Sequence, residues 1–298
     1  MSDTTASLRR KIGGAETLQS VVRTMKALAA SSIGQYERSV RALAEYDRTV
    51  ALGLSVCLRE GAPAATVVET AGRADRGVIG AVVFGSDQGL VGPFNDVVVD
   101  CALEMLTALP GQPRVWAVGE RVHARLADAG LTQVGLLSVP GSVDAIAPLI
   151  GRILIESEPR QRHGGVTELH LVHNRPRPRG VGYAPVTQRL LPLDESWRRK
   201  LVGVCWPTKE LPEVMGDAIA TLRALIREYV FVSLFRACAE SLASENASRL
   251  AAMERAERNI DELLEGLQGS FHRLRQSSID AELFDVIAGF EALGGARH

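Results

Sequence analysis

A glycine-rich stretch is the part of this sequence with the clearest potential for chemistry. It runs from Gly85 to Gly92 as Gly-Ser-Asp-Gln-Gly-Leu-Val-Gly, and it follows the apolar run 78–84. The turn between a strand and a helix is where backbone N–H groups often bind phosphate. The stretch nevertheless lacks a lysine, and its glycines do not have the spacing of either common nucleotide-binding pattern. A tight strand-to-helix turn is therefore the favoured interpretation, with an α/β nucleotide-binding enzyme that carries helical extensions as the alternative.

The histidines and cysteines do not form a recognisable reactive site. His170 and His173 are three residues apart in a strand-like segment, so they should point to opposite faces. No pair of cysteines has the C-x-x-C spacing, which favours reduced thiols in a cytosolic compartment over a metal or disulfide site. No serine, histidine and carboxylate set stands out either. We therefore predict no catalytic residues, no metal and no cofactor. The cysteines are Cys57, Cys101, Cys205 and Cys238.

The net charge and the hydropathy of the sequence limit the kinds of partner that the protein could bind. The formal net charge is -1, so there is no basic excess to neutralise the phosphates of a nucleic acid. The basic, proline-rich run 175–179 is interpreted as a solvated loop between two strands, with an acidic partner or anionic surface as the alternative. No apolar run approaches the ~18 residues that a membrane span needs, and the first residues do not resemble a signal peptide. Any work at a membrane would then be peripheral.

The prolines divide the chain into three parts. All 13 lie between Pro63 and Pro212, and proline is excluded from the interior of long helices. This distribution predicts an N-terminal coiled-coil helix over residues 1–62, a central α/β domain over 63–210, and a C-terminal coiled-coil helix over 211–298.

Apolar periodicity supports both long helices. A helix over residues 5–60 is predicted from a seam that starts at Ala15, Leu18, Val22, Met25 and Ala29, with a one-residue slip near Val40. A helix over residues 211–293 is predicted from a second seam. That seam consists of Ala239, Asn246, Met253, Ile260, Leu267 and Leu274, accompanied by Leu242, Ala256 and Leu263.

The two helices are expected to pair through these seams. Helices of this length with apolar seams gain most of their stability from packing. An excess of basic residues in the first helix and of acidic residues in the last weakly favours the pairing. Asn246 either fixes the register of the pair or lies at a surface-facing stretch. Gly266 and Gly269 are the weak point of the second helix.

The middle of the chain alternates strand and helix patterns. Strands are expected at 78–84, 114–118, 134–139, 168–173 and 183–191, with the last strand antiparallel. Helices are expected between them at 96–109, 120–129 and 143–157. This order predicts a mostly parallel sheet with helices on both faces. The whole chain is thus expected to be α/β, with a Rossmann-like central domain and two long terminal helices.

Three stretches, in order along the chain, resemble the gamma subunits of F-type ATP synthases. The first is Thr24-Met25-Lys26-Ala27-Leu28-Ala29-Ala30-Ser31. The second is Ser86-Asp87-Gln88-Gly89-Leu90-Val91-Gly92-Pro93-Phe94-Asn95. The third is Ala243-Ser244-Glu245-Asn246-Ala247-Ser248-Arg249-Leu250-Ala251-Ala252-Met253, continued by Arg275-Gln276-Ser277-Ser278-Ile279.

The resemblance implies a mechanical role without catalysis. In this family the terminal helices form an antiparallel coiled coil inside a ring of alpha and beta subunits. The α/β domain joins the epsilon subunit and the c-ring of the membrane sector. Rotation then couples ion flow to ATP synthesis or hydrolysis in the ring. By position, Met25 and Lys26 would lie near a lever segment of a beta subunit, and Arg275 and Gln276 would contact a beta catch loop.

Departures from the family pattern favour a divergent branch, such as an alternate bacterial ATPase. Ser32, His272, Asp280 and Phe290 replace the residues usual at those positions. The resemblance implies a peripheral location on the cytoplasmic face of the bacterial inner membrane. A coiled-coil scaffold unrelated to ATP synthases would explain the helices but not the three motifs.

Overall fold

The computed structural model describes residues 4–59, 78–157, 166–177, 182–193, 195–210, 212–213 and 216–294. The chain divides into two compact units. The two-helix unit comprises Met1–Leu28 and Leu250–His298, and the α/β unit comprises Ala29–Arg249. The predicted domain boundaries lie in residues 60–77 and at Leu211, outside the described part, so the three-part division stays a proposal.

Helix α1 spans Thr5–Arg59, and its buried face repeats every seven residues. One line of the seam contains Leu8, Ala15, Val22, Ala29 and Tyr36, all buried except the half-buried Val22. The second line lies four residues after each of these positions, at Ile12, Gln19, Lys26, Ile33 and Val40. Alternating steps of four and three are typical of a coiled-coil seam.

The predicted seam of α1 is wrong in two respects. Leu18 is 59% exposed, because the second line contains Gln19 instead. The slip near Val40 is absent, since the same spacing continues through Leu43, Asp47, Val50, Leu54 and Cys57. Both differences have one cause: the polar Gln19 and Lys26, rather than the apolar Leu18 and Met25, belong to the seam.

Helix α7 spans Ala218–Gly294 and starts later than residue 211. The carboxylate of Asp217 accepts a hydrogen bond from the backbone N–H of Ile219 at 2.9 Å, which is the geometry of a helix N-cap. The predicted seven-residue series is confirmed: Ala239, Asn246 and Met253 are buried, and Ile260, Leu267 and Leu274 are half-buried. Leu263 was assigned wrongly, because it is 53% exposed while Leu264 is buried.

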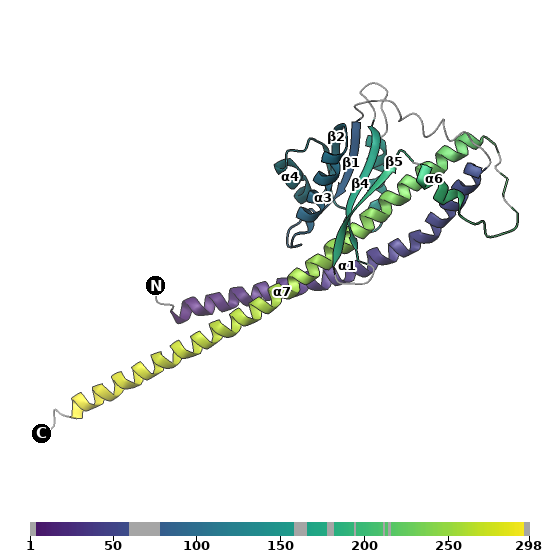
Figure 1. Cartoon of the computed structure of the whole chain (residues 1–298). Helices are drawn as coiled ribbons and strands as arrows, with labels where there is room; N and C mark the ends of the chain where they lie inside the picture. Colours follow the sequence, from purple (N-terminus) through teal and green to yellow (C-terminus); the bar gives the residue numbers. More distant parts are fainter. Residues whose placement is uncertain are drawn as a thin grey trace. The chain divides into compact units, whose positions relative to one another are not determined.

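The α/β unit contains a five-stranded sheet with the order β3-β2-β1-β4-β5. Figure 1 labels β2, β1, β4 and β5 of this sheet. Its strands are β1 (Val78–Phe84), β2 (Gln112–Val118), β3 (Gln133–Leu137), β4 (Val166–Pro176) and β5 (Tyr183–Leu191). Strands β1 to β4 are parallel and β5 is antiparallel to β4, as predicted. Helices α3 (Phe94–Ala108), α4 (Glu120–Asp128) and α5 (Ile146–Ser157) connect the parallel strands.

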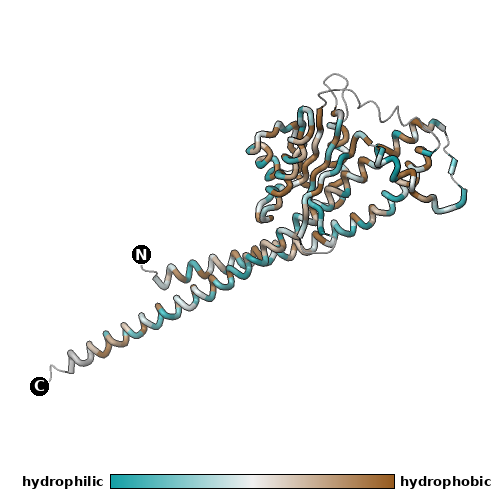
Figure 2. Tube along the Cα trace, viewed as in Figure 1, coloured by the Kyte–Doolittle hydropathy of each residue, from teal (hydrophilic) through white to brown (hydrophobic). Residues whose placement is uncertain are grey.

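Alternation along the strands builds a separate core on each face of the sheet. Ile79, Ala81 and Val83 of β1 pack into a cluster with α3 and α4. Val82 and Phe84 face the other way, into a cluster with α5 and the middle of α7. A sheet buried on both faces has strands that are apolar throughout, and Figure 2 shows this hydrophobic colouring along the strands.

A short helix, α6 (Glu195–Val202), was not predicted. Its Leu201 packs against Leu54 and Leu58 of α1 and Leu222 of α7 in a third core. The guanidinium of Arg59 donates to the carbonyls of Val202 and Val204, each at 2.6 Å, and so satisfies free acceptors at the end of α6. The segment has few apolar residues, so its periodicity gave no signal.

Candidate interaction sites on the helices and the closed turn

The two-helix unit holds α1 and α7 antiparallel through polar contacts as well as apolar ones. Glu257 of α7 binds Arg23 and Lys26 of α1, with N–O distances of 2.9 Å to each. The amide of Gln19 donates to the carboxylate of Asp261, and the guanidinium of Arg9 lies 5.4 Å from the ring centre of Phe271. Residue numbers rise on α1 as they fall on α7, which confirms an antiparallel pair within this unit.

Lys26, a predicted partner contact, is therefore engaged within its own chain. Its hydrogen bond and ion pair with Glu257 raise the pKa of the Lys26 ammonium. The same pairings, to Lys26 and then Arg23, lower the pKa of Glu257. Lys26 and the neighbouring Met25 are half-buried, so both keep part of their surface open.

Arg275 and Gln276 lie in a different setting. Both are exposed on α7, and neither makes a hydrogen bond or ion pair with any residue that the structure describes. Helix α1 begins at Thr5, and Phe271 already lies beside Arg9. The structure thus separates the two predicted contact pairs: Lys26 lies on the helix–helix seam with Met25 beside it, whereas Arg275 and Gln276 lie where that seam ends.

Every residue from Arg275 to Gly289 is exposed, including large apolar ones. Ile279, Leu283, Val286 and Ile287 recur at helical spacing, so they share one face of α7. Phe284, beside this stripe, is 69% exposed. An apolar stripe of this kind marks a surface that a partner covers. Sequence reasoning singled out Arg275 and Gln276 here but missed the stripe, although its periodicity is visible in the sequence.

The Gly85–Gly92 turn is closed by its own side chains. The carboxylate of Asp87 accepts the backbone N–H of Glu120, at the start of α4, and that of Val139, both at 3.0 Å. Asn95 accepts the N–H of Ser86 at 3.0 Å and donates to its hydroxyl at 2.9 Å. The N–H groups of Gly85 and Ser86, and that of Glu120 at the start of α4, are thus occupied by protein groups, which disfavours the nucleotide-binding alternative.

Close packing accounts for Gly85, at the start of this turn, and for Gly119, which lies against it. A Cβ at Gly85 would lie 2.3 Å from the Cβ of Val122, and one at Gly119 would lie 2.8 Å from the backbone of Ser86. Gly92 has a φ of 58°, and the hydroxyl of Ser248 on α7 donates to the neighbouring carbonyl of Val91. A tight strand-to-helix turn, as favoured from the sequence, fits these contacts.

A buried polar cluster joins β4 to α7 within the α/β unit. Glu240 binds the Nε2 of His173 at 2.8 Å and the Nε of Arg175 at 2.7 Å. The hydroxyl of Ser244 donates to the carbonyl of Asn174 at 3.1 Å, and the amide of Asn174 donates to the carbonyl of Phe94 at 2.8 Å. These bonds fix one face of α7 against the carboxyl end of β4.

Protonation in this cluster follows from burial and pairing. Burial lowers the pKa of His173, although its bond to Glu240 opposes the shift. The pKa of Glu240 is also lowered: its burial acts in the opposite direction, but its bonds to His173 and Arg175 outweigh that effect. A neutral imidazole beside an ionised carboxylate is the consistent state.

Several predictions about this region need correction or refinement. Arg175 lies in β4 and binds Glu240 at the edge of this cluster, rather than lying in a solvated loop, although its side chain is 40% exposed. Pro178 and Arg179 of the basic run lie outside the described residues. Asn246 is buried, but its amide donates to the carbonyl of Leu242 on its own helix, at 2.8 Å. That bond gives no support to a register-fixing role.

The four cysteines are free thiols. Among the described residues, no group of three or more histidine, cysteine or acidic side chains is placed to hold a metal ion. None of the helices in the described part of the chain combines the length and the apolar character that a membrane crossing requires.

Known proteins resemble this chain over nearly its whole length. The family model described as ATP synthase matches residues 4–293. The ATP synthase gamma chain of Clavibacter sepedonicus is 28% identical, with 97% of each chain covered. That of Saccharopolyspora erythraea is 27% identical, again with 97% of each covered.

A solved structure of the Euglena gracilis mitochondrial ATP synthase, comprising OSCP, F1 and c-ring, contains a chain with a similar fold. The TM-score is 0.63 at 15% identity, with 99% of this chain and 96% of that one covered. A central stalk and c-ring structure from Tetrahymena thermophila gives a TM-score of 0.53 at 20% identity, covering 79% and 99%. The fold agrees with the sequence match, and the chain belongs to the gamma chains of the ATP synthase family.

Proposed function

We propose that this chain is the central rotor shaft of a rotary ATP synthase or ATPase and has no catalytic site of its own. The observation that carries the proposal is the family match over residues 4–293. Alpha and beta subunits would form the catalytic ring around the paired helices. The epsilon subunit and the c-ring would bind the α/β part, and rotation would couple ion flow to ATP synthesis or hydrolysis.

The exposed end of α7 supports this assignment. The stripe of Ile279, Leu283, Val286 and Ile287 is apolar but uncovered by any described residue. A shaft that turns inside a ring needs a surface that slides without making fixed polar bonds, and aliphatic side chains provide one. We propose that the ring of alpha and beta subunits covers this stripe.

We further propose two contacts with beta subunits. Met25 and Lys26 would meet a lever segment, where Lys26 could exchange its bond to Glu257 for one to the partner. Arg275 and Gln276, which have no described partner in this chain, would bind a catch loop through charge-assisted hydrogen bonds. Such bonds suit the task because they can form and break as the shaft turns.

We place the chain peripherally, on the cytoplasmic face of a bacterial inner membrane, held there by its complex. The support is its resemblance to bacterial gamma chains such as that of Clavibacter sepedonicus. The same resemblance supports the proposed domains: coiled-coil helices over 1–62 and 211–298, with the α/β domain over 63–210.

The double variant Arg275→Ala with Gln276→Ala tests the catch-loop contact. In the assembled complex we expect ATPase turnover to fall several-fold while the subunit stoichiometry is unchanged. The matched control is Arg255→Ala with Arg258→Ala, which removes two exposed charges from the same helix elsewhere. Equal turnover in wild type and in the Arg275/Gln276 variant would rule out the catch-loop role.

A further inference from the structure

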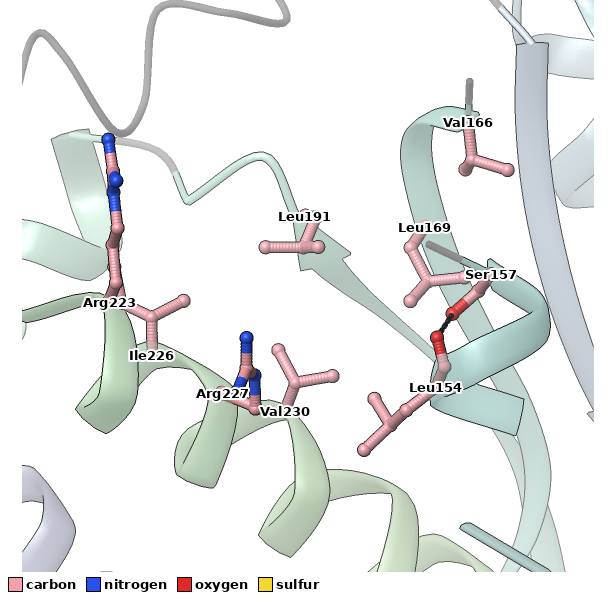
Figure 3. A pocket seen from close by; sticks show the side chains of 9 residues that line it. All are labelled: Leu154, Ser157, Val166, Leu169, Leu191, Arg223, Ile226, Arg227 and Val230. Atoms are coloured by element: carbon pink, nitrogen blue, oxygen red, sulfur yellow. Dashed lines mark hydrogen bonds between the residues drawn. The ribbon is translucent and has the colours of Figure 1, made fainter. Parts of the chain in front are cut away.

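A cavity of about 220 Å³ lies in the α/β unit, between the start of α7 and the sheet (Figure 3). Strands β4 and β5, the end of α5 and one face of α7 enclose it. Its apolar walls are Leu154, Val166, Leu169, Leu191, Ile226 and Val230. Leu169 and Val230 are buried and the other four are half-buried, so the floor is closed and the mouth is open.

The interior of the cavity offers almost no polar group to water. Among the described residues that line it, Ser157 is the one uncharged polar residue. Its hydroxyl donates to the carbonyl of Leu154, at 3.2 Å, within α5. Apolar cavities of this order of size stay dry and take up apolar molecules, as an engineered cavity of about 150 Å³ does with benzene. The walls therefore favour an aliphatic or aromatic group over water.

Two arginines give the cavity its charge. Arg223 and Arg227 lie one turn apart on α7 and both line the cavity. Neither makes a hydrogen bond or ion pair with any residue in the described ranges, and both are exposed. The nearest acid on the helix, Glu228, is instead bound to the hydroxyl of Tyr46 at 2.7 Å. Like charges at this spacing repel each other, so an anion near them would relieve the repulsion; Figure 3 shows the Arg223 side chain extending away from Arg227.

We infer that this cavity binds a medium-chain alkyl carboxylate. The chain would fill the space between Leu191, Ile226 and the β4 side chains, and the carboxylate would lie at the mouth with Arg223 and Arg227. A volume of about 220 Å³ exceeds that of the engineered cavity of about 150 Å³ that holds benzene, so it has room for an alkyl chain of several carbons. Guanidinium groups bind carboxylates in a bidentate manner, which suits this headgroup.

The inference does not depend on the rotor function, because it concerns only residues of the α/β unit. The test is a calorimetric titration of the purified full chain with octanoate. Two further ligands separate the contributions: 1-octanol carries the chain without the charge, and butyrate carries the charge with a short chain. We expect saturable binding of octanoate, with at least tenfold weaker binding of both others.

Substitutions of the lining residues test whether octanoate binds in this cavity. Arg223→Gln with Arg227→Gln should weaken octanoate binding about tenfold or more, because two charged donors are lost. Ile226→Trp or Leu191→Phe should abolish it by filling the space, and thermal unfolding checks that each variant folds. The control, Arg38→Gln with Arg41→Gln, removes a similarly spaced exposed pair from α1 and should leave binding unchanged. Absence of saturable binding, or equal affinity in the wild type and the Arg223/Arg227 variant, would overturn the inference.

Discussion

At the residue scale, His173 is held neutral inside the junction between β4 and α7. It is 1% exposed, and its only described side-chain partner is Glu240. Burial lowers its pKa below the ordinary value of 6.5. As pH falls through 6.5, the unfolded chain therefore takes up a proton that the folded chain does not. The free energy of unfolding should then decrease between pH 6.5 and the lowered pKa of His173.

The variant His173→Gln tests this pH dependence. Glutamine keeps an N–H donor for Glu240 but cannot ionise, so the loss of stability below pH 6.5 should become shallower. One group contributes at most about 1.4 kcal/mol per pH unit. Urea unfolding between pH 7.5 and 5.5 measures the slope, with the exposed His272→Gln as control. An identical slope in wild type and His173→Gln would contradict the assignment.

Asp87 is the residue that closes the glycine-rich turn. It accepts backbone N–H groups from Glu120 and Val139, so it both caps α4 and ties the turn to the end of β3. Asp87→Ala should lower the free energy of unfolding by about 1–2 kcal/mol, as loss of a helix cap does. Gln88→Ala is the control, since only its backbone carbonyl takes part, through Ser86. Equal stability of the two variants in urea unfolding would count against the capping role.

The sequence predicted the role of the glycine-rich turn but not the contacts of His173. The turn was recognised as a tight connection, and no nucleotide pattern was assigned, because local glycine spacing is visible in one dimension. The cluster of His173, Arg175 and Glu240 was not predicted, because it joins positions about 65 residues apart that share no local pattern. From the sequence, Arg175 was interpreted as a solvated charge, because its partner Glu240 lies on the distant helix α7.

At the scale of elements, periodicity predicted the long helices and the positions of the strands along the chain well but misplaced one seam line. A seam whose residues are spaced alternately by three and four has the same average period as one spaced by four and three. The sequence therefore selects between the two seams only through which positions carry apolar residues. Leu18 and Met25 seemed better seam residues than Gln19 and Lys26. The polar pair lies on the seam, half-buried, because α7 supplies Asp261 and Glu257 opposite. Only knowledge of both helices together could have resolved this.

Gly266 and Gly269 make a weak point in α7 that can be strengthened. A Cβ at either position would meet nothing within 4 Å. Alanine there should stabilise the helix by about 0.5–1 kcal/mol per site, because glycine loses more backbone entropy on folding. Thermal unfolding followed by circular dichroism measures the gain. Gly85→Ala is the contrasting variant: its Cβ would overlap Val122, so it should destabilise the protein, and a stabilised Gly85→Ala would contradict the packing described.

At the scale of the whole molecule, the proposed function assigns ATP chemistry to the alpha and beta subunits and mechanical coupling to this chain. The Gly85–Gly92 turn is filled by its own side chains, while α7 carries an apolar stripe that no described residue covers. A protein with this combination gains its function by assembly. It should bind no nucleotide alone and should change the behaviour of a catalytic ring that it joins.

The most direct test is co-expression of this chain with the alpha and beta subunits from the same genome. Size-exclusion chromatography with mass measurement reports the stoichiometry, and an ATPase assay reports turnover with and without the chain. The account predicts a stable complex of three alpha subunits, three beta subunits and one copy of this chain, whose sustained ATPase activity depends on the chain. Failure to assemble, together with nucleotide bound by the isolated chain, would contradict it.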